Sequence, residues 1–170
     1  MHACRSFPLT FALMIAAAGT AHAATVVNSF GSWTLYRDET ASKLCFLASS
    51  PAESAPATAN RDAPLLYVSS WPKDGVKAEI SVRLGFPAKK ASEPDIAVTG
   101  SNGANSFKLF VKDDRAFVTD STQELKLLDA MKKGSKLTVQ ATSERGTTIT
   151  DTYPLAGITV ALQALAGGCG

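Results

Sequence analysis

Histidine is almost missing from this 170-residue chain: the two copies are His2 and His22, and both fall within the first 23 residues. Residues 24–170 therefore carry no imidazole, the side chain that ordinarily titrates near neutral pH. This absence excludes Ser-His-Asp and Cys-His catalytic devices and imidazole metal sites from that part of the chain. We predict that the protein is not an enzyme, with no catalytic residue, no metal site and no cofactor.

Net charge and long apolar runs are also scarce. The chain has 17 Lys and Arg against 15 Asp and Glu, a net charge of +2, and no block of Lys and Arg longer than two residues. Such a chain has no electrostatic footprint for nucleic acid. No stretch of about 18 apolar residues follows the N-terminal region, so we predict no transmembrane anchor.

Residues 1–23 have the pattern of a secretory signal peptide. A single cation, Arg5, precedes an apolar segment over residues 9–18, and Ala21-His22-Ala23 has the small residues of a cleavage site. We therefore predict a periplasmic or secreted protein in which residues 24–170 form one domain. Its length suffices to bury roughly two thirds of the unfolded surface.

Cysteine is limited to three residues, and Cys4 lies in the predicted leader. The remaining pair, Cys45 and Cys169, would be exported to an oxidising compartment, where an even count indicates a bridge. We predict a structural Cys45–Cys169 disulfide. A redox-active pair is the alternative, but neither Cys-x-x-Cys spacing nor neighbouring cations favour it.

Short β-prone segments dominate the rest of the sequence. Residues 76–84 alternate between apolar and polar side chains, which is typical of a strand with one buried face. The segment 49–62 has no hydrophobic period, and we predict a flexible loop there. Further strands are predicted over residues 30–37, 43–47, 65–71, 96–99, 106–111, 115–119, 136–141 and 147–153.

Two helices are expected among these strands. Ser121 and Glu124 match a capping box, Leu125, Leu128 and Met131 would share one helical face, and Lys132-Lys133-Gly134 is typical of a helix end. Residues 158–165 also follow helical spacing. The fold class that we predict is mainly β: an antiparallel β-sandwich with one inserted short helix and a short C-terminal helix.

Several motifs together resemble those of the invasion-associated locus B family of secreted bacterial proteins. They are Gly31-Ser-Trp33, Cys45-Phe46, Gly134, Ser143-Glu-Arg-Gly-Thr147 and Asp151-Thr-Tyr-Pro-Leu-Ala-Gly157. The resemblance implies an exported β-sandwich of a Gram-negative bacterium, linked at family level to host-cell invasion, with no established reaction. Many relatives carry a Cys near the position of Arg37 and further central cysteines; this sequence lacks them, which leaves Cys45 and Cys169 as the pair.

Surface candidates are few. We predict that Trp33 is buried and that most aromatic residues belong to the core. Asp113 and Asp114 have the pattern of a tight turn. Glu144, Arg145 and Asp151 are interpreted as the charged rim of a hairpin. The candidate interaction residues are Trp71, Arg145 and Tyr153.

Three hypotheses of function follow. The first is a non-enzymatic interaction protein whose loops or sheet edge contact an unidentified protein at the cell envelope or host surface. The second is a small-ligand or glycan-binding module, in which Trp71 and Tyr36 line a groove. The third, a hydrolase that uses carboxylates, requires two acidic side chains about 5 to 10 Å apart in a cleft, and no spacing here indicates such a pair.

Overall fold

The computed structural model describes residues 24–38, 44–57, 61–101 and 103–168, so that the predicted leader and Cys169 lie outside it. Its strands are β1 (Thr25–Phe30), β2 (Trp33–Asp38), β3 (Leu44–Ser49), β4 (Glu53–Ala55), β5 (Leu65–Trp71), β6 (Val76–Arg83), β7 (Asp95–Gly100), β8 (Gly103–Lys112), β9 (Arg115–Val118), β10 (Lys136–Thr142) and β11 (Thr148–Pro154). Its helices are the 3-10 turn η1 (Pro72–Asp74), α1 (Ser121–Lys133) and α2 (Ile158–Ala166).

All described strands belong to one antiparallel sheet, in the order β1-β2-β3-β5-β6-β9-β8-β7-β10-β11-β4. Strand β8 joins two half-sheets: its first part pairs with β7 up to Lys108, and its last part, from Leu109, pairs with β9. We call the strands from β1 to β9 in this order the first half-sheet, and β7, β10, β11 and β4 the second. The predicted mainly β, antiparallel class with two helices is confirmed. The two layers of the fold are halves of one sheet, because β8 is long enough to pair with β7 in one half and with β9 in the other.

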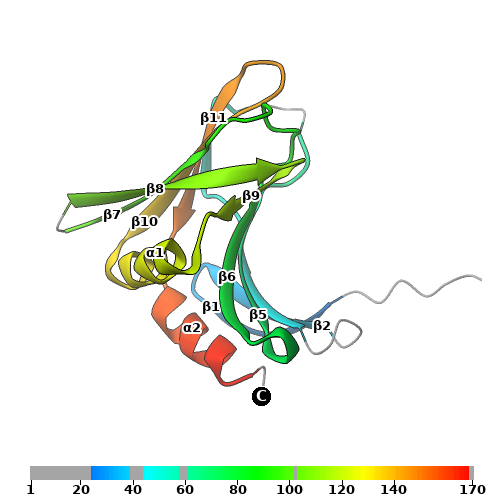
Figure 1. Cartoon of the computed structure of the whole chain (residues 1–170). Helices are drawn as coiled ribbons and strands as arrows, with labels where there is room; N and C mark the ends of the chain where they lie inside the picture. Colours follow the sequence, from blue (N-terminus) through cyan, green and yellow to red (C-terminus); the bar gives the residue numbers. More distant parts are fainter. Residues whose placement is uncertain (1–23, 39–43, 58–60, 102, 169–170) are drawn as a thin grey trace, which may run out of the picture.

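One hydrophobic core joins the inner faces of both half-sheets to the two helices. Figure 1 shows α1 and α2 within the angle between the half-sheets. Helix α1 contacts β7, β8 and β9, while α2 contacts β1, β2 and β3. Trp33 and Tyr153, at 0% exposure, are among the largest buried side chains, so burial of Trp33 is confirmed. Within the described ranges, neither helix is long and apolar enough to cross a membrane.

The alternation predicted for residues 76–84 is confirmed in β6. Ile80, Val82 and Leu84 are fully buried, while Lys77 is exposed on the other face. The strand predicted over residues 30–37 is wrong as one element, because a turn at Gly31-Ser32 divides it into β1 and β2. Gly31 has φ +60°, a left-handed conformation that glycine adopts without the Cβ penalty.

The segment 49–62, predicted as a flexible loop, contains a strand. Within it, β4 pairs with β11, and the amide of Ala52 donates to the carbonyl of Thr152 at 2.8 Å. Arg61, at the other end of the segment, is buried in an ion pair. The prediction was wrong for β4 and Arg61, which are held by β11, about 90 to 100 positions away, and not by a hydrophobic period of their own.

Helix α1 is confirmed, but its cap and its buried face differ from prediction. The N-cap is Asp120, whose carboxylate accepts from the amides of Thr122 and Gln123 at 2.8 and 2.9 Å. This leaves the Glu124 carboxylate to accept from the Ile80 amide at 2.6 Å, across to β6. Leu125 is 69% exposed, whereas the buried face consists of Leu127, Leu128, Ala130 and Met131.

The two glycine motifs at opposite ends of the described chain meet in space. The Ser32 amide donates to the Ala156 carbonyl at 3.1 Å. A Cβ on Gly157, which has φ +89°, would overlap the carbonyl oxygen of Phe30, and one on Gly31 would press on that of Ala156. The turn between β1 and β2 thus packs backbone against backbone on the loop that leads into α2, and glycine is required on both sides.

Candidate functional site

The outer face of the first half-sheet carries a row of aromatic side chains. Because successive residues of a strand point to opposite faces, the residues between the buried ones face outward. The row, which we call the aromatic stripe, consists of Tyr36 on β2, Phe46 on β3, Tyr67 on β5, Phe117 on β9 and Phe110 on β8. These residues are half-buried, except for Phe110, which is exposed. The prediction that most aromatic residues belong to the core is wrong for this set.

Strand register places the stripe in two parts that are offset by two residues between β3 and β5, where Phe46 pairs with Ser69 and not with Tyr67. Tyr36 pairs with Phe46, Phe117 pairs with Phe110, and Ser81 on β6 stands in register between Tyr67 and Phe117. Ser81 is only 4% exposed although it faces outward, because larger side chains flank it on both sides. The stripe therefore runs from β2 across the first half-sheet to β8.

The rings of the stripe contact one another. Tyr36 and Phe46 are parallel within 11° with centroids 5.1 Å apart, and Phe110 and Phe117 lie within 24° at 5.4 Å. Tyr67 meets Phe46 edge-on at 5.9 Å. In each parallel pair one ring face is covered by its neighbour, which leaves ring edges as a large part of the accessible surface.

Both ends of the stripe carry exposed apolar side chains. Phe110 is 45% exposed, and at the opposite end Val26 of β1 pairs with Tyr36 and is 57% exposed. Large apolar side chains that cluster on a protein surface mark an interaction site more often than isolated ones do. The stripe is thus the strongest candidate for a binding surface in the described part of the chain.

Three cations run beside the stripe, two residues further along the same strands. Arg83 on β6 is in register with Arg115 on β9, which is in register with Lys112 on β8. We call these three residues the cationic row. The Arg115 guanidinium lies 5.7 Å from the centroid of the Tyr67 ring, a cation–π distance that joins the row to the stripe.

The outer face of the second half-sheet has a different chemistry. It consists mainly of hydroxyl and amide side chains, of which Thr142 and Thr148 hydrogen-bond at 3.0 Å and Gln140 donates to Thr150 at 3.2 Å. On this face Lys108 Nζ lies 2.7 Å from Asp95 Oδ1 in an ion pair. The two outer faces of one sheet therefore differ, and the aromatic side chains gather on one of them.

The candidate interaction residues do not form one surface. Tyr153 is 0% exposed, so its prediction as an interaction residue is wrong: it lies on the inner face of β11, where burial raises the pKa of its hydroxyl. Trp71 is half-buried at the end of β5, on the first half-sheet. Arg145 is exposed in the turn between β10 and β11, on the second.

The predicted turn at Asp113 and Asp114 is confirmed between β8 and β9, where Asp113 has φ +57°. The charged rim is confirmed for the exposed Glu144 and Arg145 but is wrong for Asp151, which is 2% exposed. Cys45 is buried on β3 at 2% exposure. Its predicted partner Cys169 lies outside the described residues, and the bridge stays a prediction.

Asp151 forms a buried ion pair that sequence reasoning missed. Arg61 donates from Nη1 to Asp151 Oδ2 at 2.9 Å, and its Nη2 contacts Oδ1. Ser54 joins the pair by accepting from Nη2 at 2.8 Å and donating to Oδ1 at 2.6 Å. The hydrogen bond from Arg61 to Asp151 raises the pKa of the guanidinium against the effect of burial. With side-chain exposures of 7% and 3%, the pair is closed to solvent and holds structure together.

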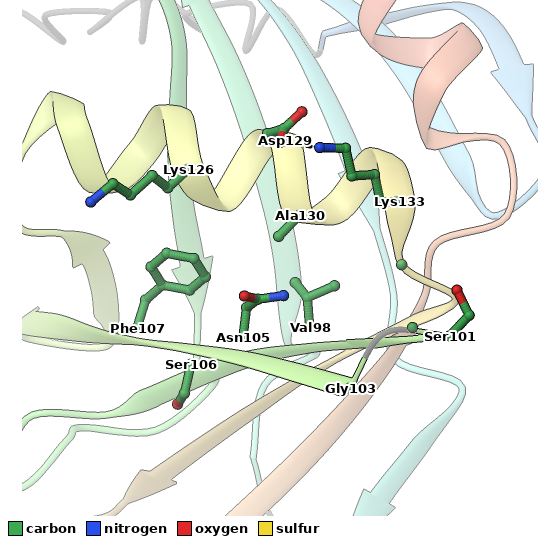
Figure 2. A pocket seen from close by; sticks show the side chains of 12 residues that line it. Val98, Ser101, Gly103, Asn105, Ser106, Phe107, Lys126, Asp129, Ala130 and Lys133 are labelled. Carbon is green, nitrogen blue, oxygen red and sulfur yellow. Dashed lines mark hydrogen bonds and ion pairs between the residues drawn. The ribbon is translucent and has the colours of Figure 1, made fainter.

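A groove of about 390 Å³ lies between α1 and the β7–β8 hairpin. Figure 2 shows Val98, Asn105 and Phe107 projecting from the hairpin toward α1, while Ser106 projects away. Lys133, at the rim, is paired with Asp129 at 2.6 Å. The groove offers an apolar floor and one further ammonium group, that of Lys126.

The fold and the site define a mainly β protein that presents an aromatic sheet face and holds its buried charges in an internal pair. The family model described as "Invasion associated locus B (IalB) protein" matches residues 33–166. The chain belongs to this family. No curated protein matches it.

One solved structure gives a measure of the likeness in fold. The crystal structure of invasion associated protein B from Bartonella henselae matches this chain with a TM-score of 0.60 at 17% sequence identity. The match covers 82% of this chain and 95% of that one. At this identity the likeness establishes the shared fold.

Proposed function

We propose that this protein is an exported, non-enzymatic interaction protein of the invasion-associated type, which binds another protein at the cell envelope or host surface. The aromatic stripe carries this proposal. It is a row of aromatic side chains on the outer face of the sheet, interrupted at β6 by Ser81. Aromatic residues are the side chains most enriched at the centres of protein interfaces. Membership of the invasion-associated family supports the same reading.

The ring geometry favours a protein partner over a glycan. A sugar or a nucleobase stacks on an open ring face. In the stripe, Tyr36 and Phe46 cover one face of each other, and so do Phe110 and Phe117. Ring edges and partly exposed faces suit the side chains of a protein surface, which pack around them from several directions.

The charged groups support a role other than catalysis. Histidine is confined to residues 1–23, and the buried carboxylate of Asp151 is neutralised by Arg61. The glycan or small-ligand alternative would use the groove between α1 and the β7–β8 hairpin, with Phe107 as its apolar floor and Lys126 as its cation.

Export and a disulfide complete the proposal. The predicted leader would deliver residues 24–170 to the periplasm or the medium, where Cys45 and Cys169 would be oxidised. Helix α2 packs on β2 and β3, and β3 is the strand that carries Cys45. This packing brings the C-terminal part of the described chain to the strand where the bridge would form.

Affinity capture with a matched pair of variants tests the proposed surface. The mature chain, Phe110→Ser and Leu125→Ser are each immobilised and exposed to envelope fractions and to host-cell membrane extracts. Leu125 is also a large apolar residue, 69% exposed on α1 and away from the stripe. We expect Phe110→Ser to lose a partner that the native chain and Leu125→Ser both retain. Equal capture by all three would show that the stripe is not the binding surface.

A further inference from the structure

The cationic row sets like charges side by side on three neighbouring strands, β6, β9 and β8. Like charges placed directly opposite each other on neighbouring strands repel. Arg83 faces Arg115, and Arg115 faces Lys112. The ion pairs found among the described residues include Arg61–Asp151, Lys108–Asp95 and Lys133–Asp129, and none of these three contains a member of the row.

Two of the three cations point their charge to solvent. Arg83 is half-buried and donates from Nε and Nη2 to the Ala63 carbonyl at 3.0 and 2.8 Å, which fixes it to the loop before β5. Lys112 and Arg115 are both exposed, and Arg115 also lies over the Tyr67 ring. An incoming anion would therefore meet Arg115 and Lys112 directly beside the stripe.

The sign of the charge changes along β6, from one side of Ser81 to the other. On β6, Ser81 stands in the stripe, with Arg83 two residues beyond it and Glu79 two residues before it. Glu79 is in register with Ser69 of β5, which is in register with Phe46 of β3. It therefore lies level with Phe46 and on the opposite side of Ser81 from the cationic row. A partner segment with both apolar and acidic side chains would be accepted in one orientation, with its carboxylates over Arg115 and Lys112.

We propose that the partner of the aromatic stripe is a protein that docks through an acidic segment. In this segment, Asp or Glu residues lie next to aromatic or aliphatic residues. This inference rests on the proposed function and specifies the chemistry of its partner. The apolar side chains of the segment pack on the stripe, and its carboxylates form charge-assisted hydrogen bonds with Arg115 and Lys112. The same contact relieves the repulsion within the row.

Defined polyanions test this partner chemistry without knowledge of the natural protein. The probes are a random copolymer of glutamate and tyrosine, polyglutamate, and heparin, each measured against the mature chain by biolayer interferometry. We expect the copolymer to bind more tightly than either of the other two. Arg115→Glu combined with Lys112→Glu should weaken its binding by about tenfold or more, because lost rim charges lower affinity and on-rate together.

The matched control is Lys136→Glu, an exposed cation on β10 in the second half-sheet. It changes one charge without touching the row, and we expect less than a threefold effect on copolymer binding, of the kind that a general electrostatic field produces. A thermal melt distinguishes binding from folding. The double variant should melt close to the native chain, because Arg115→Glu places an opposite charge beside Arg83 while positions 115 and 112 still carry like charges.

Three results would overturn the inference. One is copolymer binding that the row variants leave unchanged. Another is tighter binding of heparin than of the copolymer, which would assign the row to an anionic glycan. A third is absence of copolymer binding. Failure of this inference is distinct from failure of the proposed function. A captured partner whose binding depends on Phe110 but not on Arg115 and Lys112 would support the stripe as the binding surface and would rule out docking through an acidic segment.

Discussion

Arg61 and Asp151, separated by 90 positions in the sequence, form a buried ion pair that joins two parts of the fold. The guanidinium also donates to the Leu84 carbonyl at 3.0 Å and lies 5.9 Å from the centroid of the Phe86 ring. One side chain thus ties the segment after β4 to β11 and to the chain that leaves β6. Its charge is paired with Asp151 in the interior of the protein.

Removing one member of this pair should be costly. We expect Arg61→Met to lower the free energy of unfolding by about 3–5 kcal/mol, because it leaves the Asp151 carboxylate buried without its counterion. The double variant Arg61→Met with Asp151→Leu should recover much of this loss. Urea denaturation measures both, with Lys133→Ala as the exposed control, for which about 0.3–0.5 kcal/mol is expected. Equal losses in the single variant and the control would refute a structural role.

Substitution of Gly157 should disrupt the contact between the two glycine motifs. Gly157→Ala combines a left-handed backbone with an overlap on the Phe30 carbonyl, so a loss of more than about 2 kcal/mol is expected. Gly146→Ala is the control, since Gly146 has φ +85° but no atom within 4 Å of the place that a Cβ would take. It should cost only the backbone term of about 1–2 kcal/mol. Similar melting temperatures for both variants would contradict the close approach.

The Glu124 carboxyl should make stability depend on pH. Burial raises its pKa, the hydrogen bond from the Ile80 amide opposes this, and the Glu79 carboxylate adds to the rise. Since the folded-state pKa lies above the unfolded one, the folded protein binds more protons just above the ordinary glutamate range, and stability falls as pH rises through that window. Glu124→Gln keeps an oxygen for the Ile80 amide but cannot ionise.

The comparison of Glu124→Gln with the native chain isolates this effect. We expect the difference in unfolding free energy, native chain minus variant, to be largest at acidic pH and to fall as the pH approaches neutrality. Urea midpoints taken across that range measure the difference. A gap between the two proteins that does not change with pH would show that Glu124 titrates alike in the folded and unfolded states.

Intact mass tests the Cys45–Cys169 bridge. The mature chain purified without reductant should be two hydrogens lighter than the reduced chain. Such a bridge closes a loop of 125 residues, for which the chain-entropy model gives about 4–5 kcal/mol, and Cys169→Ser should lower stability by about 2–5 kcal/mol. Identical masses with and without reductant would rule the bridge out.

Local signals in the sequence predicted much of the fold. The alternation in β6, the spacing of α2 and the Lys-Lys-Gly end of α1 depend on neighbouring residues, which is why each was recognisable. The motifs that end at Trp33 and Gly157 were sufficient to indicate the family. Their mutual contact was not predictable, because it depends on how the ends of the described chain come together.

The site depended on long-range pairing. Arg61 follows a segment without any period, so nothing near it indicates burial, and Asp151 looks like an exposed hairpin charge until β4 is placed beside it. The stripe had a signal that was misread. Phe46 stands at an outward position between two buried residues, and Tyr36 stands at the outward position after the buried Leu35. Strand pairing then brought Phe46 beside Tyr67, and register across six strands is not encoded in any one segment.

The most direct test of the aromatic stripe as the binding surface is photocrosslinking from the surface itself. A benzophenone amino acid replaces Phe110 in one protein and Leu125 in another, and each is irradiated in its native envelope and against host-cell membranes. We predict a discrete covalent adduct from position 110 and none from position 125. Adducts from position 125 alone would contradict the assignment of the stripe as the binding surface.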